Sequence, residues 1–496
     1  MAEMPSRGFP RTFWVANVME LFERGAYYGM NSVLAVYLTG STARGGLGFG
    51  EQTVGFLQSI IYATTYVVPI LGGALADRYG YRRMLLVAFS LLATGYFAAG
   101  QSSAYAAVFL SLLVMATGSG LFKPIISGTI ARTTDERTSA IGFGIYYWMI
   151  NLGAFVAPMV VSVIKGFSWQ YVFVASSAYT GLMLIPTVFL FREPPRPAST
   201  KKLKDVLIGA AQVLGDARFM LMVVIYSGFW ILYFQNYGSV LWYLRDFVDR
   251  SAVSHAVTAL LASVGVGWTF TFDSEHVTAL NAGTIIVLQM LVSRLVRNRP
   301  AIPTMVTGMG IAGLGYACFA ISHNVWVFVA GIMIATIGEM TAHPKYFSAV
   351  GLVAPADRKA LYMGYGFLYG VLGSLIGSNV GAFLYERMVK PQVHMPGGAA
   401  TTRLFWLLFV ALDLVAAFGL LWFGRSFAAD TPDTRRRART VMSVIYALVL
   451  VLGAFFVWVA CSAGTVQYRT AVQALIFLAI GAGGLAMNRR TGAAPA

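Results

Sequence analysis

Long runs of apolar residues follow one another along almost the whole chain. Of its 496 residues, 57% are hydrophobic and 11% are charged, and the mean hydropathy is +0.68. A helix needs about 20 mostly apolar residues to cross the hydrocarbon core of a bilayer, and by that criterion the chain contains roughly fourteen such runs. An ordinary soluble domain carries about 25% charged residues. The sequence therefore predicts an all-α polytopic membrane protein.

The basic residues fall in short clusters between the apolar runs. The formal net charge of +16 is compatible with a nucleic-acid partner, but the clusters occupy every second connection, as the positive-inside rule describes. They comprise Arg78, Arg82, Arg83, Arg132, Arg137, Lys201, Lys202, Lys204, Arg294, Arg297, Arg299, Arg358, Lys359, Arg435, Arg436 and Arg437. We therefore expect no nucleic-acid partner and a lipid bilayer around the protein. Both termini are predicted to be cytoplasmic, in a plasma membrane such as the inner membrane of a bacterium.

The order of the runs predicts two bundles of six helices. The bundles are assigned to residues 12–191 and 217–424, and the Pro-rich, basic stretch 192–216 is assigned to a cytoplasmic linker. Two further helices are expected within 438–488, with no function indicated by the sequence. Two halves with weak internal symmetry are typical of transporters whose binding site lies at the midplane between the bundles.

Three ionisable residues interrupt the first apolar run. Glu20, Glu23, Arg24, Tyr27 and Tyr28 recur at the spacing of one helical face. A charged side chain at the centre of a membrane helix costs about 2.5–3.5 kcal/mol even on the milder insertion scales, so such residues usually mark an ion or substrate path. The alternative is that Glu23 and Arg24 only neutralise each other within the helix.

Several segments resemble known transporter signatures. The glycines, Asp77 and Arg78 at 73–83 resemble the cytoplasmic motif of the major facilitator superfamily. The segment 20–29 resembles the E-x-x-E-R-F-x-Y-Y-G signature of the proton-dependent oligopeptide transporter family, with Gly25 in the place of phenylalanine. Segments 66–73, 118–127, 146–153 and 338–344 resemble further parts of that family. The chain is identified as a divergent member, and the resemblance implies a major facilitator fold with two extra C-terminal helices.

The resemblance also implies roles for individual residues. Arg24 and Lys123 correspond to the residues that hold the peptide carboxylate, and Glu339 to the residue that holds the peptide amino group. Glu20 and Glu23 are the candidates for proton coupling, since a proton and a substrate can compete for the same cations. The remaining candidates line the site or act in gating. They are Tyr27, Tyr28, Tyr66, Tyr147 and Asn151 for substrate binding, and Asp77 and Arg78 for locking the inward ends of the bundles.

Two charged positions of the family pattern are neutral in this chain. Asn31 stands where the family usually has an arginine, and Phe234 stands where it has a glutamate. Losing both charges together avoids leaving one of them unpaired in the membrane. We therefore expect no ion-pair gate on the extracellular side, and the departures leave the peptide specificity and the proton stoichiometry open.

The function expected from these observations is proton-coupled import of di- and tripeptides by alternating access. The alternatives are an importer or exporter of another zwitterionic or amphiphilic solute, and a membrane sensor that binds its ligand without moving it. An intramembrane enzyme would need a nucleophile with a base or a metal cluster, and the sequence has no HExxH motif. No cofactor or metal is expected, because the proton gradient supplies the driving force. Asp413 in the twelfth run and the long connection 246–275 have no assigned role.

Overall fold

The computed structural model describes residues 8–135, 137–194, 203–355, 358–393, 399–462 and 468–493. These residues form helices joined by short connections, and among them the only β-type pairing is an isolated bridge between Asp249 and Asn324. The prediction of an all-α protein is therefore confirmed.

The first half of the chain contains six spans. They are α1 (Arg11–Thr39), α2 (Glu51–Tyr79), α3 (Tyr81–Gly100), α4 (Tyr105–Arg132), α5 (Ser139–Ile164) and the pair α6 (Trp169–Leu182) and α7 (Leu184–Phe189), while η1 (Thr42–Arg44) lies between α1 and α2. The sixth span is divided at Met183, three residues before Pro186. A proline has no N–H to bond the carbonyl four residues earlier, so the helix is interrupted there.

The second half repeats this pattern with more interruptions. Its elements are α9 (Ala217–Tyr233), η2 (Phe234–Tyr237), α10 (Ser239–Phe247), α11 (Ser251–Ser263), α12 (Glu275–Val296), α13 (Ala301–Ile321), α14 (Val325–Val353), α15 (Lys359–Tyr365), α16 (Leu368–Leu384), η3 (Tyr385–Val389), η4 (Lys390–Gln392) and α17 (Ala399–Ser426). Two long helices follow, α18 (Pro432–Ser462) and α19 (Tyr468–Ala493).

Thirteen helical segments of the described chain are long and apolar enough to cross a membrane. The 29-residue helix α1, which contains Glu20, Glu23 and Arg24, is not among them. With α1 the described residues provide fourteen spans, as expected from the sequence. The charges lower the mean hydropathy of α1, although its length matches that of the other spans.

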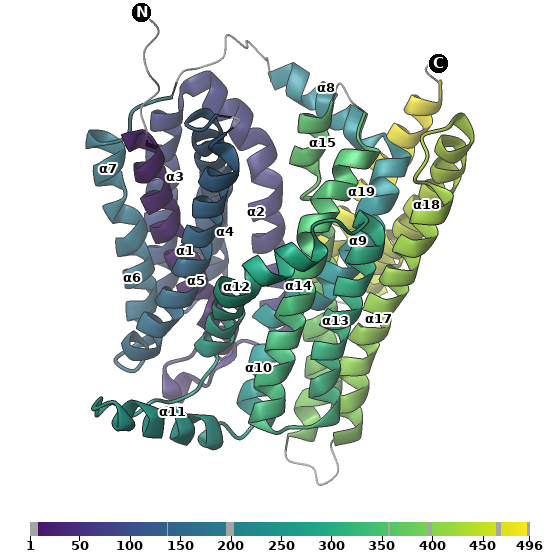
Figure 1. Cartoon of the computed structure of the whole chain (residues 1–496). Coiled ribbons are helices and arrows are strands. Elements are labelled where there is room, and N and C mark those ends of the chain that lie inside the picture. Colours follow the sequence, from purple (N-terminus) through teal and green to yellow (C-terminus); the bar gives the residue numbers. More distant parts are fainter. Residues whose placement is uncertain are drawn as a thin grey trace, which may run out of the picture.

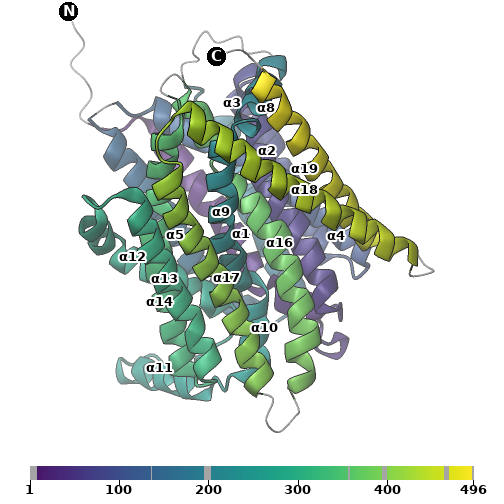
Figure 2. The same ribbon diagram turned by 90° about the vertical axis from the view of Figure 1, so that its right-hand side faces the viewer.

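The helices form two groups that lie side by side. Figure 1 shows α1 to α7 on one side and α9 and α13 to α17 on the other, with α8 (Leu203–Leu214) lying across one end and α11 across the opposite end. We call these the α8 end and the α11 end. In Figure 2, α18 and α19 run next to each other and obliquely to the other helices of the second half. The α18–α19 pair is joined to that half by the hydrogen bond from Gln473 Nε2 to Asn379 Oδ1, at 2.8 Å.

Two short helices lie in segments for which no helix is predicted. The expected linker 192–216 contains α8, while residues 195–202 of it lie outside the described residues. The connection 246–275 contains α11. Both helices are shorter than a membrane span, so the search for runs of about 20 apolar residues does not detect them.

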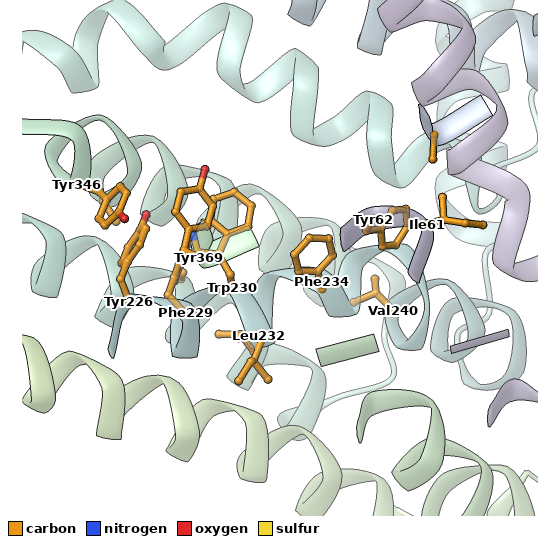
Figure 3. Packing of buried hydrophobic residues seen from close by; sticks show 14 of the residues in the cluster. Ile61, Tyr62, Tyr226, Phe229, Trp230, Leu232, Phe234, Val240, Tyr346 and Tyr369 are labelled. Atoms are coloured by element: carbon orange, nitrogen blue, oxygen red, sulfur yellow. The ribbon is translucent and has the colours of Figure 1, made fainter. Parts of the chain in front are cut away.

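The two halves meet closely where small residues face each other. A Cβ atom on Gly55 of α2 would lie 2.3 Å from Ala382 Cβ and 2.6 Å from the carbonyl oxygen of Ser378, both on α16. Only glycine permits this approach of two helix backbones. Aromatic side chains fill the adjoining interior, and Figure 3 shows Tyr62 of the first half beside Phe234 of the second.

Candidate functional site

A buried hydrogen-bonded cluster joins α1 to α4 in the first half. Arg24 donates from Nε to Glu23 Oε2 at 2.5 Å and from Nη2 to Glu23 Oε1 at 2.7 Å. Ser119 of α4 donates to Glu23 Oε1 at 2.9 Å and accepts from Arg24 Nη2 at 3.2 Å. Arg24 Nε also lies 3.6 Å from Glu20 Oε1. The three charges of α1 thus form one cluster with a hydroxyl from another helix.

Glycines allow the neighbouring helices to approach this cluster. A Cβ atom on Gly153 of α5 would lie 2.7 Å from the carbonyl oxygen of Leu21 and 3.3 Å from Arg24 Cβ. At Gly25, where the family pattern has phenylalanine, a Cβ atom would already contact Ala157 Cβ at 3.6 Å. This is an ordinary van der Waals distance, so α5 packs directly against this position of α1.

Lys123 is held by a carbonyl group that a proline has freed. Its Nζ lies 3.4 Å from the carbonyl oxygen of Thr65 on α2 and 5.3 Å from the centre of the Tyr66 ring. Thr65 precedes Pro69 by four residues, so its carbonyl lacks the usual helical donor. Among the described residues Lys123 forms no ion pair, and its ammonium group remains able to bind an anion.

Glu339 lies in the second half, near the middle of α14. Asn281 of α12 donates from Nδ2 to Glu339 Oε2 at 3.1 Å and to Thr336 Oγ1 at 3.0 Å. A small pocket adjoins this carboxylate. It is lined by Phe229, Tyr233, Asn236, Asn281, Ala312, Tyr316, Ala335, Thr336 and Glu339.

These charged groups all lie deep within their helices. At about 1.5 Å per residue, Arg24 is about 20 Å from Arg11, Lys123 is about 14 Å from Arg132, and Glu339 is about 21 Å from either end of α14. Within the thickness of the membrane core, the first half therefore presents two cations together with the acids of α1. The second half presents the carboxylate of Glu339.

Two of the aromatic residues predicted to line the site, Tyr27 and Tyr28, lie beside Arg24. The Arg24 guanidinium carbon lies 5.0 Å from the centre of the Tyr27 ring and 5.9 Å from that of Tyr28, a cation–π arrangement. Tyr147 of α5 is 43% exposed. Asn151 is buried and donates to the carbonyl of Tyr147 within the same helix, at 2.9 Å. No hydrogen bond or ion pair of the described residues joins Asn151 to the charged cluster.

Asp77 and Arg78 do not connect the two halves in this state. Asp77 accepts from Arg132 Nη2 of α4 at 2.9 Å, and the Arg78 guanidinium lies 5.3 Å from the centre of the Tyr79 ring. All of these residues belong to the first half. The locking role expected for Asp77 and Arg78 stays a prediction for another state of the protein.

Ion pairs join the halves at the α11 end. Glu51, which is fully buried at the start of α2, accepts from Lys390 Nζ at 2.7 Å and lies 3.6 Å from Arg245 Nη2. On another side, Lys165 lies 2.5 Å from Asp273 Oδ2 and 2.6 Å from Glu275 Oε2. We call these the α11-end ion pairs. This end carries the connection 40–50, which the charge pattern assigns to the extracellular side, so the expectation that no ion pair closes that side is wrong.

The surroundings of the pair formed by Lys165 and Asp273 favour its charged form. Burial works against charge at Asp273, but Lys165 and Arg250 outweigh it and hold the pKa of Asp273 below its ordinary value. Burial likewise opposes the charge of Lys165, but Glu275 and Asp273 raise the pKa of Lys165 above its ordinary value. Both groups therefore favour their charged forms when this end is closed.

The two departures from the family pattern meet at one residue that the sequence reasoning missed. Tyr62 of α2 donates to Asn31 Oδ1 at 2.6 Å, and its ring stacks on Phe234 with 5.4 Å between centroids (Figure 3). Gln58 donates to the Tyr62 hydroxyl at 3.1 Å and to the carbonyl of Tyr237 at 2.7 Å. Neutral hydrogen bonds and ring stacking thus connect α1 and α2 to η2 where the family pattern places charges.

Ser119 and Asn281 are also functional candidates that were missed. Ser119 lies between Gly118 and Gly120 in the segment used for the family resemblance, and Asn281 is a polar residue within the apolar run of α12. A polar side chain at such a depth is a signal available in the sequence. Which partner it finds depends on how the helices pack.

Known proteins resemble this chain in sequence and fold. The family model described as Major Facilitator Superfamily matches residues 20–378. An uncharacterized transporter, YclF of Bacillus subtilis (strain 168), is 25% identical over 78% of this chain and 90% of its own length. A di-/tripeptide transporter of Lactococcus lactis subsp. lactis (strain IL1403) is 24% identical over 64% of this chain and 65% of its own. The crystal structure of a peptide transporter POT in complex with sulfate superposes with a TM-score of 0.69 at 21% identity, covering 86% of this chain and 98% of that one.

Proposed function

Because this chain belongs to the Major Facilitator Superfamily, whose model matches residues 20–378, we propose that it imports small peptides together with protons by alternating access. The chain is a multi-pass membrane transporter rather than an enzyme, and relatives named as peptide transporters support peptides as its cargo. Proton coupling and the direction of transport belong to the proposal.

The observation that carries the proposal is the distribution of charge at mid-membrane depth. Arg24 and Lys123 stand in the first half and Glu339 stands in the second. A peptide with free ends has a carboxylate at one end and an ammonium group at the other, so the cations bind the first and Glu339 binds the second. A ligand that contacts both halves favours the states in which they close around it.

The proton acts through Glu23 in this scheme. Glu23 holds Arg24 in two hydrogen bonds, at 2.5 and 2.7 Å, and thereby occupies the guanidinium that the substrate carboxylate needs. Protonation of Glu23 removes its charge and frees Arg24 for the substrate. Loss of that proton restores the pair and expels the carboxylate. Glu20, 3.6 Å from Arg24, serves as a second acceptor in the same cluster.

The orientation of the protein follows from its basic residues. Arg82 and Arg83, which open α3, and Arg435 to Arg437, near the start of α18, all lie at the α8 end, which the positive-inside rule assigns to the cytoplasm. Both termini are then cytoplasmic, in a plasma membrane. The described ion pairs between the halves lie at the α11 end. The state is therefore closed toward the outside, and the substrate would leave toward the cytoplasm.

The test uses the purified full chain in proteoliposomes with labelled dialanine. An inward proton gradient is expected to drive accumulation, and Glu23→Gln is expected to abolish accumulation while exchange of labelled for unlabelled dialanine continues. Asp433→Asn, in an exposed ion pair with Arg437 on α18, is the matched control and should accumulate dialanine like the wild type. Gradient-independent uptake by the wild type, or full accumulation by Glu23→Gln, would contradict the coupling role.

A second candidate is transport of another zwitterionic solute, inward or outward, and Asn31 and Phe234 favour it. The family resemblance links these positions to coupling and gating, and here both are neutral and bound to Tyr62. Exchange assays with a panel of dipeptides and single amino acids separate the two candidates. Exchange with amino acids alone would replace peptides as the cargo. Saturable binding without any exchange would instead identify a sensor.

A further inference from the structure

Asp413 is a buried acid that plays no part in the proposed site. It lies near the middle of α17, about 20 Å from either end of that helix, and its side chain is 0% exposed. Within the described structure neither of its carboxyl oxygens has a hydrogen-bond partner. The carboxyl faces α13, where a Cβ atom on Gly313 would lie 3.2 Å from Asp413 Oδ2.

The surroundings of Asp413 contain no counter-charge. The helices packed on this face of α17 are α9 and α13, and the titratable groups that interact with Asp413 are the phenols of Tyr226 on α9 and Tyr316 on α13. No described Lys, Arg, His or other acid interacts with it. An unpaired carboxylate in hydrocarbon costs far more free energy than a neutral acid, so this group holds a proton in the present state.

The same two phenols connect Asp413 to the substrate site. Tyr226 and Tyr316 each interact electrostatically with both Asp413 and Glu339. Tyr316 and Ala312 line the pocket beside Glu339, and Gly313, against which Asp413 lies, is the next residue along α13. Asp413 therefore packs against α13, the helix that forms part of the wall of that pocket.

We propose that Asp413 is a second proton-binding site, which exchanges its proton through the pocket beside Glu339 during transport. The exchange forms and breaks only the carboxyl O–H bond, and water in the pocket donates and accepts the proton. The acid makes no hydrogen bond in the present state, so it contributes no polar stabilisation here. Its use in transport rests on the proposed function, in which protons drive the carrier.

Infrared spectroscopy of the full chain tests the site without requiring transport. The wild type is expected to show the carbonyl stretch of a protonated carboxylic acid at neutral pH, absent in Asp413→Asn. That band should shift within minutes in heavy water, since the proton exchanges. A band unchanged in Asp413→Asn, or one that does not shift, would overturn the proposal. If Asp413→Asn is not monodisperse, Asp413→Ser provides the same comparison.

The number of protons carried with each dialanine tests the role in transport. Reversal potentials in proteoliposomes should show this number falling by one in Asp413→Asn, and unchanged in the surface control Asp433→Asn. An unchanged number in Asp413→Asn refutes the transport role. A wild type that moves dialanine without protons refutes the proposed function instead, and the infrared measurement then decides whether Asp413 binds an exchangeable proton.

Discussion

Replacing Glu51 by glutamine should open the α11 end more often. Its buried carboxylate accepts from Lys390 Nζ at 2.7 Å and lies 3.6 Å from Arg245 Nη2, so one acid on α2 binds two cations of the second half. Glutamine keeps the shape of the side chain and removes its charge. The closed state loses this attraction, whereas the state open at the α11 end, in which the halves are apart, never has it.

The size of the effect follows from the exposure of the partners. A hydrogen bond to a charged group contributes about 1.5–3 kcal/mol, and the lower part of that range applies because the side chain of Lys390 is 49% exposed to solvent. Arg245 retains its hydrogen bonds to Asp246 and Thr39. We therefore expect a loss of about 1–2 kcal/mol, which changes the ratio of the two states by a factor of about 5–30.

Distances between two spin labels measure that ratio. Ser103, between α3 and α4, and Ala252, on α11, are exposed residues of the two halves at this end. The free cysteines Cys318 and Cys461 are first replaced by serine. Pulsed electron resonance on Glu51→Gln should show a larger population of long distances than the same labelled protein with Glu51.

A matched control and a double variant make the result decisive. Asp433→Asn breaks an exposed ion pair with Arg437 that lies within α18 and joins no two halves, so its distances should stay those of the wild type. Lys390→Gln should act like Glu51→Gln, and the two together should add less than the sum of the single effects. Unchanged distances in Glu51→Gln, or fully additive effects, would refute the reasoning.

Two further predictions concern the same closure and the packing beneath the site. Between about pH 8 and about pH 5 the labelled pair should show no opening, because the lowered pKa of Asp273 in the closed state keeps the ion pair with Lys165 charged until the pH falls below the ordinary Asp value of about 3.9. Opening within this range would contradict that assignment. Gly153→Ala should lower the melting temperature of the purified protein, because its Cβ would lie 2.7 Å from the Leu21 carbonyl, and overpacking costs about 1–3 kcal/mol. Gly144→Ala, whose Cβ meets nothing within 4 Å, is the control and should be neutral or stabilising.

The spans could be predicted from the sequence because the bilayer sets their length. Each spanning run must cover the same thickness of bilayer, so the fall in hydropathy at its ends marks where the helix ends. This holds even for α1, although it contains charges. The helices α8 and α11 could not be predicted in this way, because they do not cross the bilayer. With 12 and 13 residues they are too short to cross the bilayer, so no external length constrains them.

The candidate site was predictable only where its partners lie close in sequence or in a recognised motif. Glu23 and Arg24 are adjacent, so their pairing needed little more than a helix. Ser119, which completes that cluster, lies 95 residues from Arg24, and Glu51 lies 339 residues from Lys390. Such pairs depend on how the two halves pack, and a single sequence contains no record of that packing.

The charged residues that close the α11 end are different from the acids proposed to bind protons. Asn31 and Phe234, the neutral residues at the family's charged positions, meet at Tyr62, where a hydrogen bond and ring stacking replace charge. The charges that close the structure lie instead at its rim, and Glu51, eleven residues before Tyr62, is about 17 Å further out along α2. The lowered pKa of Asp273 keeps its pair with Lys165 ionised at physiological pH, so titration of Asp273 does not open this end. Under the proposed coupling, opening of the α11 end would therefore follow from events at the deeper cluster around Glu23 rather than from titration of Asp273.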